Sequence, residues 1–473
     1  MAEAIPIASV KNENESPLDV FGEQPGLYNL YTQICLCFPV QDSSSHSDII
    51  ATLTSSLVRL SASFPWIAGQ VVNEGGPTGT YKIVPFEQIP RLVIKDLQAD
   101  PAIPSMDAMR RAGFPMSMLD ENIICPRNTL AAMTAAEGDP APVFLVQANF
   151  ITGGLLLTFT GQHNVMDMTG QGQIIRLLSN ARHNVPFTGD ELANGNPDRR
   201  SIIPPLDDAF DPVTELARML VHSHLPRDED SSSPATPLPS PPPAPPKSSW
   251  AYFIFSPTSL AALKSLATES MVPQLGYIST DDAVSAFIWQ SITRARLPRL
   301  DSRRATTFAR AIDPRRFLGI PDGYVGVVQN MTYHTYVLQK LVHEPLGSVA
   351  SNLRAALNPA SSRVAYNTRA LATFLQRSAD NRRIVSVTAT LDLSSDIMLS
   401  SWAKEKLYQP DFNLGLGGPE VVRRPAFAPV ESLLYLMPKA LDGEIAAAVC
   451  LRDEDMERLK ADEQFTKYAQ YIG

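Results

Sequence analysis

The first half of the chain alternates between short apolar runs and amphipathic stretches, a pattern typical of a mixed α/β protein. Strands are expected at residues 27–39, 80–85 and 143–160. The Gly153-Gly154 pair inside the last run predicts a hairpin turn. Apolar side chains recur at helical spacing over residues 47–63 and 170–183, which predicts a helix at each place.

A proline-rich segment then interrupts the pattern. Eight of the thirteen residues from Pro234 to Pro246 are proline, so neither a helix nor a strand ladder is expected there. From Trp250 onward the chain has strand and helix patterns of its own. We therefore predict three parts: an N-terminal domain at residues 1–200, a crossover linker at 201–249 and a C-terminal domain at 250–473.

Composition supports two cores. A chain of 473 residues with 44% hydrophobic content is longer than one ordinary domain. The net charge of −9 arises from 49 acidic and 40 basic residues spread along the chain, so we expect no nucleic-acid partner. No run of eighteen apolar residues occurs, and the N-terminus lacks the charged start and apolar core of a secretory signal. We expect a soluble, cytoplasmic monomer that does not bind membranes.

The four cysteines, Cys35, Cys37, Cys125 and Cys450, are too few and too scattered for a disulfide framework or a four-ligand metal site. A reducing compartment fits this pattern. The histidines are also scattered and no His-Glu-x-x-His motif is present, which argues against a metal-dependent hydrolase. We expect no metal.

The segment "HNVMD" at residues 163–167 places a histidine at the end of a predicted strand and an aspartate just before a predicted helix. Asp167 and Thr169 are possible helix caps. On this spacing alone, His163 is more simply an ordinary core or surface histidine and Asp167 a cap, because a single His-x-x-x-Asp match is not specific.

A second motif changes this interpretation. Together with "QPDFNLGLGGP" at residues 409–419, the segment "HNVMD" resembles the paired signatures of the BAHD acyltransferases, His-x-x-x-Asp near mid-chain and Asp-Phe-Gly-Trp-Gly near the end. Further similar segments are "STDDAVSAFIWQSITRARL" at 279–297, "FARAIDPRRF" at 308–317 and the closing region 432–465. Within the family, residues 19–40, 153–179 and 326–334 most resemble the fungal trichothecene 3-O-acetyltransferases.

The chain also departs from the family pattern. Met168 follows the aspartate where most members have glycine, and Asn413 and Leu414 replace the glycine and tryptophan of the second motif. Asp411, Gly415 and Gly417 remain, and the resemblance implies a structural role for Asp411.

The resemblance implies a two-domain, chloramphenicol-acetyltransferase-like α/β fold in which each domain is a mixed sheet flanked by helices, with the active site between the domains. It implies that His163 is the general base. It further implies that Asp167 is a structural carboxylate paired with Arg315, although the sequence leaves Arg310 and Arg316 open as partners. Imidazole suits the role of base because its ordinary pKa of about 6.5 lets the neutral form accept a proton near neutral pH.

The implied cosubstrate is acetyl-coenzyme A, entering between the domains. Ser279, Thr280 and Arg310 are candidates for binding it, through a helix N-terminus and a guanidinium, although Ser279 and Thr280 also form an ordinary N-cap. Asn330 and Tyr333 are candidates for contacts with the alcohol substrate, by position only.

We therefore expect an acetyl-coenzyme A-dependent O-acetyltransferase that acetylates the C3 hydroxyl of a trichothecene by direct transfer, in self-protection or biosynthesis. One alternative is the same chemistry on another fungal secondary-metabolite alcohol or amine. The other is a catalytically silent binding protein on the same scaffold, which the presence of both His163 and Asp167 disfavours.

Overall fold

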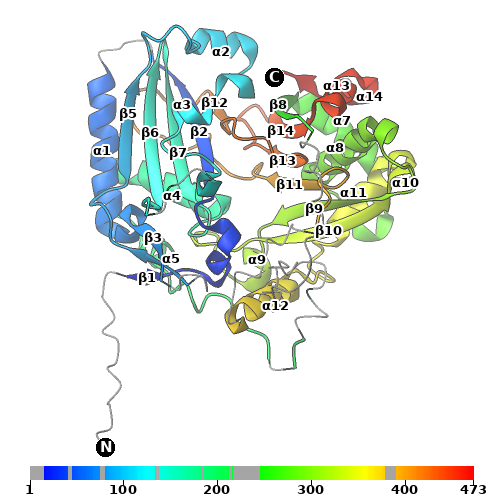
Figure 1. Cartoon of the computed structure of the whole chain (residues 1–473), viewed down its shortest axis with the longest axis horizontal. Helices are drawn as coiled ribbons and strands as arrows, with labels where there is room; N and C mark the ends of the chain where they lie inside the picture. Colours follow the sequence, from blue (N-terminus) through cyan, green and yellow to red (C-terminus); the bar gives the residue numbers. More distant parts are fainter. Residues whose placement is uncertain are drawn as a thin grey trace, which may run out of the picture.

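The structure is a computed structural model that describes residues 15–473 apart from 41–44, 75–79, 134–135, 137, 184, 208, 212–215, 217–245 and 379–389. Most of the proline-rich segment, and with it the expected linker, lies outside the described residues. The described chain forms two large sheets with helices packed on them (Figure 1). No described helix has the length and apolar character needed to cross a membrane.

The first sheet has five strands in the order β12-β2-β7-β6-β5, and only its β5–β6 pair is parallel. Its strands are β12 (Val421–Arg423), β2 (Tyr31–Pro39), β7 (Gly154–Gln162), β6 (Phe144–Ile151) and β5 (Arg91–Asp96). The helices α1 (His46–Ser63) and α4 (Met168–Arg182) share a core with one face of this sheet, and α2 (Met106–Ala112) and α3 (Glu121–Ile124) pack on the other.

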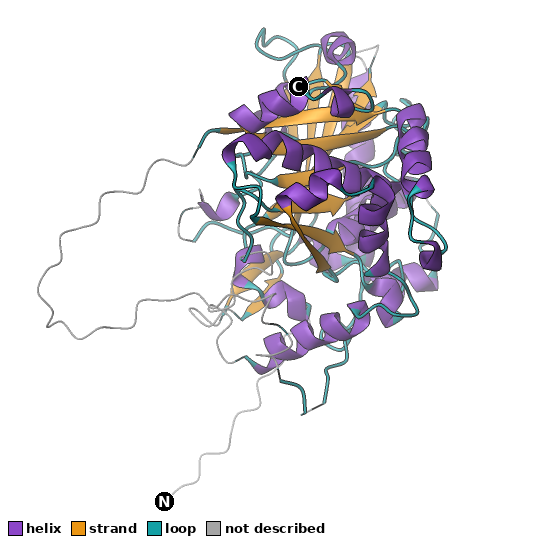
Figure 2. Ribbon diagram, turned by 90° about the vertical axis from the view of Figure 1, so that its right-hand side faces the viewer, coloured by secondary structure: helices purple, strands orange, loops and turns teal. Residues whose placement is uncertain are grey.

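The second sheet has seven strands in the order β10-β9-β11-β13-β14-β8-β15, again with parallel and antiparallel pairs. Its strands are β8 (Ser248–Phe255), β9 (Ala305–Ile312), β10 (Asn330–Val337), β11 (Ile397–Ser401), β13 (Leu433–Leu436), β14 (Ile445–Arg452) and β15 (Gln470–Tyr471). Figure 2 faces this half of the molecule and shows helices over the strands. Those that share its core include α7 (Pro257–Glu269), α8 (Thr280–Arg296), α11 (Leu346–Ala355) and α13 (Asp453–Ala461).

Smaller elements complete the described chain. A three-stranded antiparallel sheet contains β1 (Ser16–Pro17), β4 (Tyr81–Val84) and β3 (Gln70–Asn73). The shorter or peripheral helices are α5 (Gly189–Gly195), α9 (Arg315–Leu318), α10 (Leu338–His343), α12 (Val364–Arg377) and α14 (Glu463–Thr466).

The predicted fold class, two mixed sheets flanked by helices, is confirmed. The helices expected at 47–63 and 170–183 are α1 and α4 within two residues at each end, and Gly153 forms the expected turn between β6 and β7 with a positive φ of 77°. The strand expected from residue 27 begins only at Tyr31, because Pro25–Leu27 forms a short 3-10 turn.

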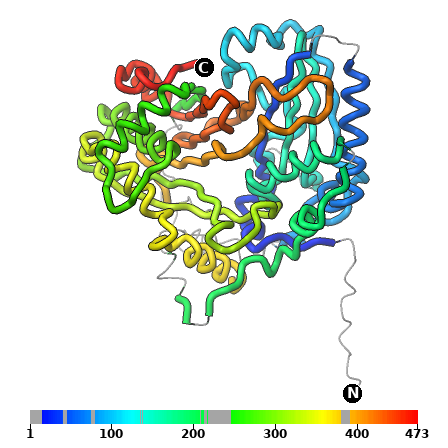
Figure 3. The backbone as a smooth tube through the Cα atoms, turned by 180° about the vertical axis from the view of Figure 1, so that it is seen from behind, coloured from blue at the N-terminus to red at the C-terminus, as the bar shows by residue number. Residues whose placement is uncertain are grey.

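One strand crosses from the C-terminal half of the chain to the first sheet. β12 comes from the C-terminal half but pairs antiparallel with β2 of the first sheet, with Val422 opposite Leu36. Figure 3 shows this orange segment reaching across to the blue and cyan strands. The division at residues 1–200, 201–249 and 250–473 stays a prediction, and it does not describe this crossing. A strand of three residues carries too little pattern to be recognised in the sequence.

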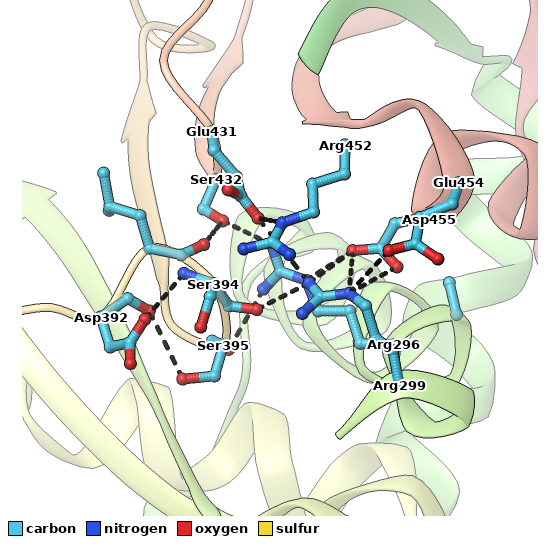
Figure 4. A network of polar contacts seen from close by, with 12 residues as sticks. Arg296, Arg299, Asp392, Ser394, Ser395, Glu431, Ser432, Arg452, Glu454 and Asp455 are labelled. Carbon is cyan, nitrogen blue, oxygen red and sulfur yellow. Dashed lines mark hydrogen bonds and ion pairs between the residues drawn. The ribbon is translucent and has the colours of Figure 1, made fainter. Parts of the chain in front are cut away.

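A buried polar network fixes the second half internally (Figure 4). Asp455, at the start of α13, is fully buried and accepts hydrogen bonds from Arg299 at 2.6 and 2.9 Å. Arg299 and Arg296 also donate to the backbone carbonyls of Ser394 and Ser395. The network therefore joins the end of α8, the start of α13 and the loop before β11. It thereby supports β11, whose end lies at the site described below.

Candidate active site

His163 lies in the short segment between β7 and α4. Its N–H donates to the carbonyl of Leu30 at 2.7 Å, which fixes this segment against the start of β2. The side chain is half-buried, and Nδ1 makes no hydrogen bond to another described residue. Burial lowers the pKa of His163 below 6.5, and this outweighs the opposite effects of its own backbone carbonyl and of Asp167. The imidazole is therefore neutral at neutral pH.

Asp167 is the N-cap of α4, and protein donors engage both oxygens of its carboxylate. Oδ1 accepts from the Gly170 N–H at 2.8 Å and from Nη2 of Arg315 at 2.9 Å, and Oδ2 accepts from the Val328 N–H at 2.8 Å. The approach is close: a Cβ added at Gly170 would lie 2.2 Å from the Val325 carbonyl oxygen. Asp167 thus joins α4 to a loop of the second half.

Of the three arginines that the sequence left open, Arg315 is the one that pairs with Asp167. Its side chain is 1% exposed, and it also donates to the Gly326 carbonyl at 2.8 Å and to Asp313 at 3.0 Å. Burial disfavours the charged guanidinium, but Asp167 and Asp313 outweigh it and hold the pKa of Arg315 above its usual range. Arg310 pairs instead with Asp281 and Asp282, and the exposed Arg316 lies over the Phe317 ring.

A second carboxylate holds the same loop. Asp19 is completely buried, pairs with Arg199 at 2.7 Å, and accepts from the Tyr324 hydroxyl and, at 3.2 Å, from the Val327 N–H. Burial raises the pKa of Asp19, and the charge of Arg199 opposes that rise. The loop at residues 324–328 is therefore held by two carboxylates of the first half.

A pocket of about 880 Å³ lies beside these anchors, between α4 and the ends of β9 and β11. Its volume is within the range of about 300–1,000 Å³ typical of small-molecule sites. The arginines and lysines on its wall are Arg176, Arg310, Arg316, Arg354, Lys404 and Lys406. Of these, Arg316, Lys404 and Lys406 are exposed and suited to an anionic ligand. His163 is not among the lining residues.

The expected cosubstrate-binding residues differ in their surroundings. Ser279 and Arg310 line this pocket, whereas Thr280 does not. Ser279 forms a capping box with Asp282 at the start of α8, and Arg310 is 6% exposed and neutralised by two carboxylates. A role for them in binding coenzyme A stays a prediction, and the exposed cations of the pocket are better placed to meet phosphates.

Asn330, Tyr333 and Asp411 are the remaining site residues expected from the sequence. The Asn330 amide donates to Thr368 at 3.1 Å and accepts from the Met331 N–H, so its hydrogen-bonding groups are occupied by protein. Burial raises the pKa of the half-buried Tyr333. Asp411 is exposed at the pocket rim, where its carbonyl accepts from Ser179 at 2.9 Å.

Glu405 is a candidate that the sequence did not reveal. Its Oε1 accepts from the Thr169 hydroxyl at 2.8 Å, and its side chain lines the pocket beside Gly172. Burial raises the pKa of Glu405 to about 7, the hydrogen bond from Thr169 opposes this, and the charge of Asp167 adds to it. The only sequence signal was the charged run "KEK" just before the second motif.

Described residues include no group of three His, Cys, Asp or Glu side chains arranged to hold a metal ion.

Similarity to known proteins agrees with this geometry. Residues 30–182 match the model of the trichothecene 3-O-acetyltransferase-like N-terminal domain, and residues 121–466 match that of the transferase family. The chain is 54% identical to the O-acetyltransferase dmxR13 of Cryptosporiopsis sp. (strain 8999) and 50% identical to the trichothecene 3-O-acetyltransferase TRI101 of Fusarium sporotrichioides. Each alignment covers 96% of this chain and 97% of the relative.

Among solved structures, TRI101 of F. graminearum complexed with coenzyme A and T-2 mycotoxin matches with a TM-score of 0.89 and 48% identity. The match covers 97% of this chain and all of that one.

The raised pKa of Glu405 predicts a pH-dependent stability. In the unfolded chain the Glu405 carboxyl titrates near 4.5. The stabilisation that comes from its raised pKa in the folded chain is therefore complete below that pH, and it is lost as the pH rises towards about 7. Glu405→Gln keeps an acceptor for Thr169 without the charge. We expect it to exceed the wild type in free energy of unfolding by about 1–3 kcal/mol at pH 8, with little difference near pH 5, in urea titrations.

Glu457→Gln is the matched control, because the Glu457 side chain is 71% exposed and paired with Lys460. It should leave the difference from the wild type nearly constant with pH. An equal pH response of the two variants would contradict the raised pKa of Glu405.

Proposed function

Since this chain belongs to the BAHD transferase family and is an acyltransferase, we propose that it transfers an acetyl group from acetyl-coenzyme A to a hydroxyl of a fungal secondary metabolite, with His163 as general base. The observation that carries this proposal is the half-buried imidazole of His163, whose pKa is lowered by burial, on a segment that ends at the ion pair of Asp167 with Arg315.

The proposed chemistry needs one proton acceptor. As the alcohol oxygen attacks the thioester carbonyl carbon, the neutral imidazole of His163 removes the hydroxyl proton. The tetrahedral intermediate then breaks its carbon–sulfur bond, and the imidazolium returns the proton to the departing thiolate. No serine or cysteine acyl-enzyme is needed, because the acetyl group moves directly between the two substrates.

The pocket supports binding of the coenzyme. Exposed Arg316, Lys404 and Lys406 on its wall suit the phosphates, since Arg and Lys both bind phosphate and Arg does so through a planar fork. The TRI101 structure above binds coenzyme A, and its similarity extends over nearly the whole of this chain. We therefore assign this pocket to the acyl donor.

For the acceptor we propose the C3 hydroxyl of a trichothecene. Support comes from the match to the trichothecene 3-O-acetyltransferase-like domain and from 50% identity to a trichothecene 3-O-acetyltransferase. A second candidate is another fungal alcohol, because the identity to the O-acetyltransferase dmxR13 is higher, at 54%.

Replacement of the base tests the mechanism. We expect His163→Ala to lower kcat by roughly 10² to 10⁴, the usual contribution of a positioned acid–base group, with nearly unchanged binding of coenzyme A in calorimetry. The wild-type rate should fall on the acid side as the imidazole becomes charged. His343→Ala, at the end of α10, serves as the control histidine and should keep full activity. Wild-type turnover by His163→Ala, or an accumulating acetyl-enzyme, would refute base-assisted direct transfer.

A substrate panel tests the acceptor. Purified protein is incubated with acetyl-coenzyme A and a trichothecene with a free 3-hydroxyl, the same trichothecene blocked at that position, and unrelated polyketide alcohols. We expect thiol release and an acetyl ester, detected by mass spectrometry, only with the free 3-hydroxyl. Acetylation of the polyketide alcohols but not of the trichothecene would keep the mechanism and overturn the substrate.

A further inference from the structure

The segment that carries His163 is held by a second buried arginine. Arg199, which follows α5, donates through Nη1 to the Val165 carbonyl at 2.9 Å and to the carboxylate of Asp19 at 2.7 Å. Val165 lies between His163 and Asp167, so the first of these bonds is made to the segment itself. One nitrogen of Arg199 therefore ties the backbone beside the proposed base to a buried carboxylate.

The side chain of Arg199 has little freedom. It is 3% exposed, and its guanidinium carbon lies 4.5 Å from the Trp66 ring centre. The indole N–H of Trp66 in turn donates at 2.8 Å to the carbonyl of Gly195, just before Arg199 in the chain. A planar guanidinium that lies over a ring and binds a carboxylate is fixed in its orientation. The bond to Val165 is thus made by a preorganised donor.

A close backbone contact supports the same segment. Asp19 begins the 3-10 turn at Val20–Glu23, and Gly22 in that turn packs against Asn164. A Cβ added at Gly22 would lie 2.2 Å from the Asn164 carbonyl oxygen, well inside normal contact distance. The neighbouring carbonyls of Asn164 and Val165 are thus contacted by Gly22 and by the arginine that Asp19 binds.

Asp19 extends this contact to the second half of the chain. Its carboxylate also accepts from the Tyr324 hydroxyl and, at 3.2 Å, from the Val327 N–H. The next N–H of that loop, on Val328, donates to Asp167 at 2.8 Å. One loop therefore joins the two carboxylates. The histidine segment is tied to this loop at its end through Asp167, and near its middle through the arginine.

We propose that Arg199 is a positioning residue for the reaction: together with Asp19 it holds the backbone at Val165, so that His163 keeps the orientation in which its imidazole can take the hydroxyl proton. This inference rests on the proposed role of His163 as general base. A displacement of about 1 Å caused by a distant residue can lower a rate by about 10²-fold, so a contact to the backbone beside the base is enough to matter. Arg199 does not line the pocket assigned to the acyl donor, so donor binding should not depend on it.

The variant that tests this proposal combines Asp19→Asn with Arg199→Met. Loss of Arg199 alone would leave Asp19 buried without its cation, which destabilises the fold whatever happens to the base. The double variant has no unpaired charge and keeps an acceptor at residue 19, but it lacks the bond to the Val165 carbonyl. It therefore separates the positioning of the segment from the penalty of an unpaired buried charge.

The first measurement is steady-state kinetics with acetyl-coenzyme A and a trichothecene that has a free 3-hydroxyl. We expect the double variant to lose about 10²-fold in kcat, with a nearly unchanged KM for acetyl-coenzyme A. The control combines Arg294→Met with Asp462→Asn, a partly buried pair 2.9 Å apart that joins the end of α8 to the start of α14. This control should keep the wild-type kcat.

Gly22→Ala tests the same contact without changing a charge. Its methyl group would push against the Asn164 carbonyl, so we expect kcat to fall by at least about tenfold in a folded protein. Gly26→Ala is the control, because Gly26 is exposed and a Cβ added there meets no described atom within 4 Å. Gly26→Ala should keep the wild-type kcat.

The second measurement, hydrogen exchange followed by mass spectrometry without substrates, is independent of activity. The His163 N–H donates to Leu30 at 2.7 Å and the Val165 N–H to Gln162 at 3.0 Å, so both amides are protected. In the Asp19 and Arg199 double variant we expect peptides over residues 163–167 to exchange faster, while those of β7 and α13 keep wild-type rates. This result is observable even if the wild type acetylates no trichothecene, in which case only the proposed function fails.

Wild-type kcat in the folded double variant would overturn the proposal. So would a lowered kcat with unchanged exchange over residues 163–167, because the segment would then not have moved. An equal loss of kcat in the Arg294 and Asp462 control would also contradict it, since Arg199 would then act only through overall stability.

Discussion

The ion pair between Asp167 and Arg315 is the interaction on which the arrangement of the site depends. It joins the first turn of α4 to α9, and the same two side chains bind the Val328 N–H and the Gly326 carbonyl. A buried pair with further hydrogen bonds is held firmly, because loss of one partner leaves an uncompensated charge in the protein interior. The segment that carries His163 ends at this anchor, so its conformation depends on both halves of the chain.

The site is consequently a property of the assembled molecule rather than of either half. The first half supplies His163, Asp167 and Asp19, and the second supplies the loop at 324–328 that both carboxylates hold. β12 returns from the second half to the first sheet, where it pairs with β2. On the pocket wall, Arg310 is neutralised by Asp281 and Asp282, whereas Arg316, Lys404 and Lys406 are exposed.

Hydrophobic periodicity in the sequence predicted the long helices and strands, and the resemblance carried by two paired motifs predicted the chemistry. Asp167 was expected as a cap from its place before an amphipathic helix, and it is one. The sequence left open which of Arg310, Arg315 and Arg316 pairs with Asp167. Tertiary packing decides which side chain of this short segment points towards the carboxylate. Three-residue β12 and the buried carboxyl of Glu405 gave no usable pattern, since both acquire their character from residues distant in sequence.

The central claim is that Asp167 and Arg315 act as one unit that positions His163. A double-mutant cycle tests it most directly, with Asp167→Asn, Arg315→Met and the double variant compared in both kcat/KM and free energy of unfolding. The account predicts that stability and activity fall together in each single variant, and that the double variant is little worse than the worse single one, with a coupling energy of about 1–3 kcal/mol. Fully additive losses, or loss of activity in Asp167→Asn at unchanged stability, would contradict it.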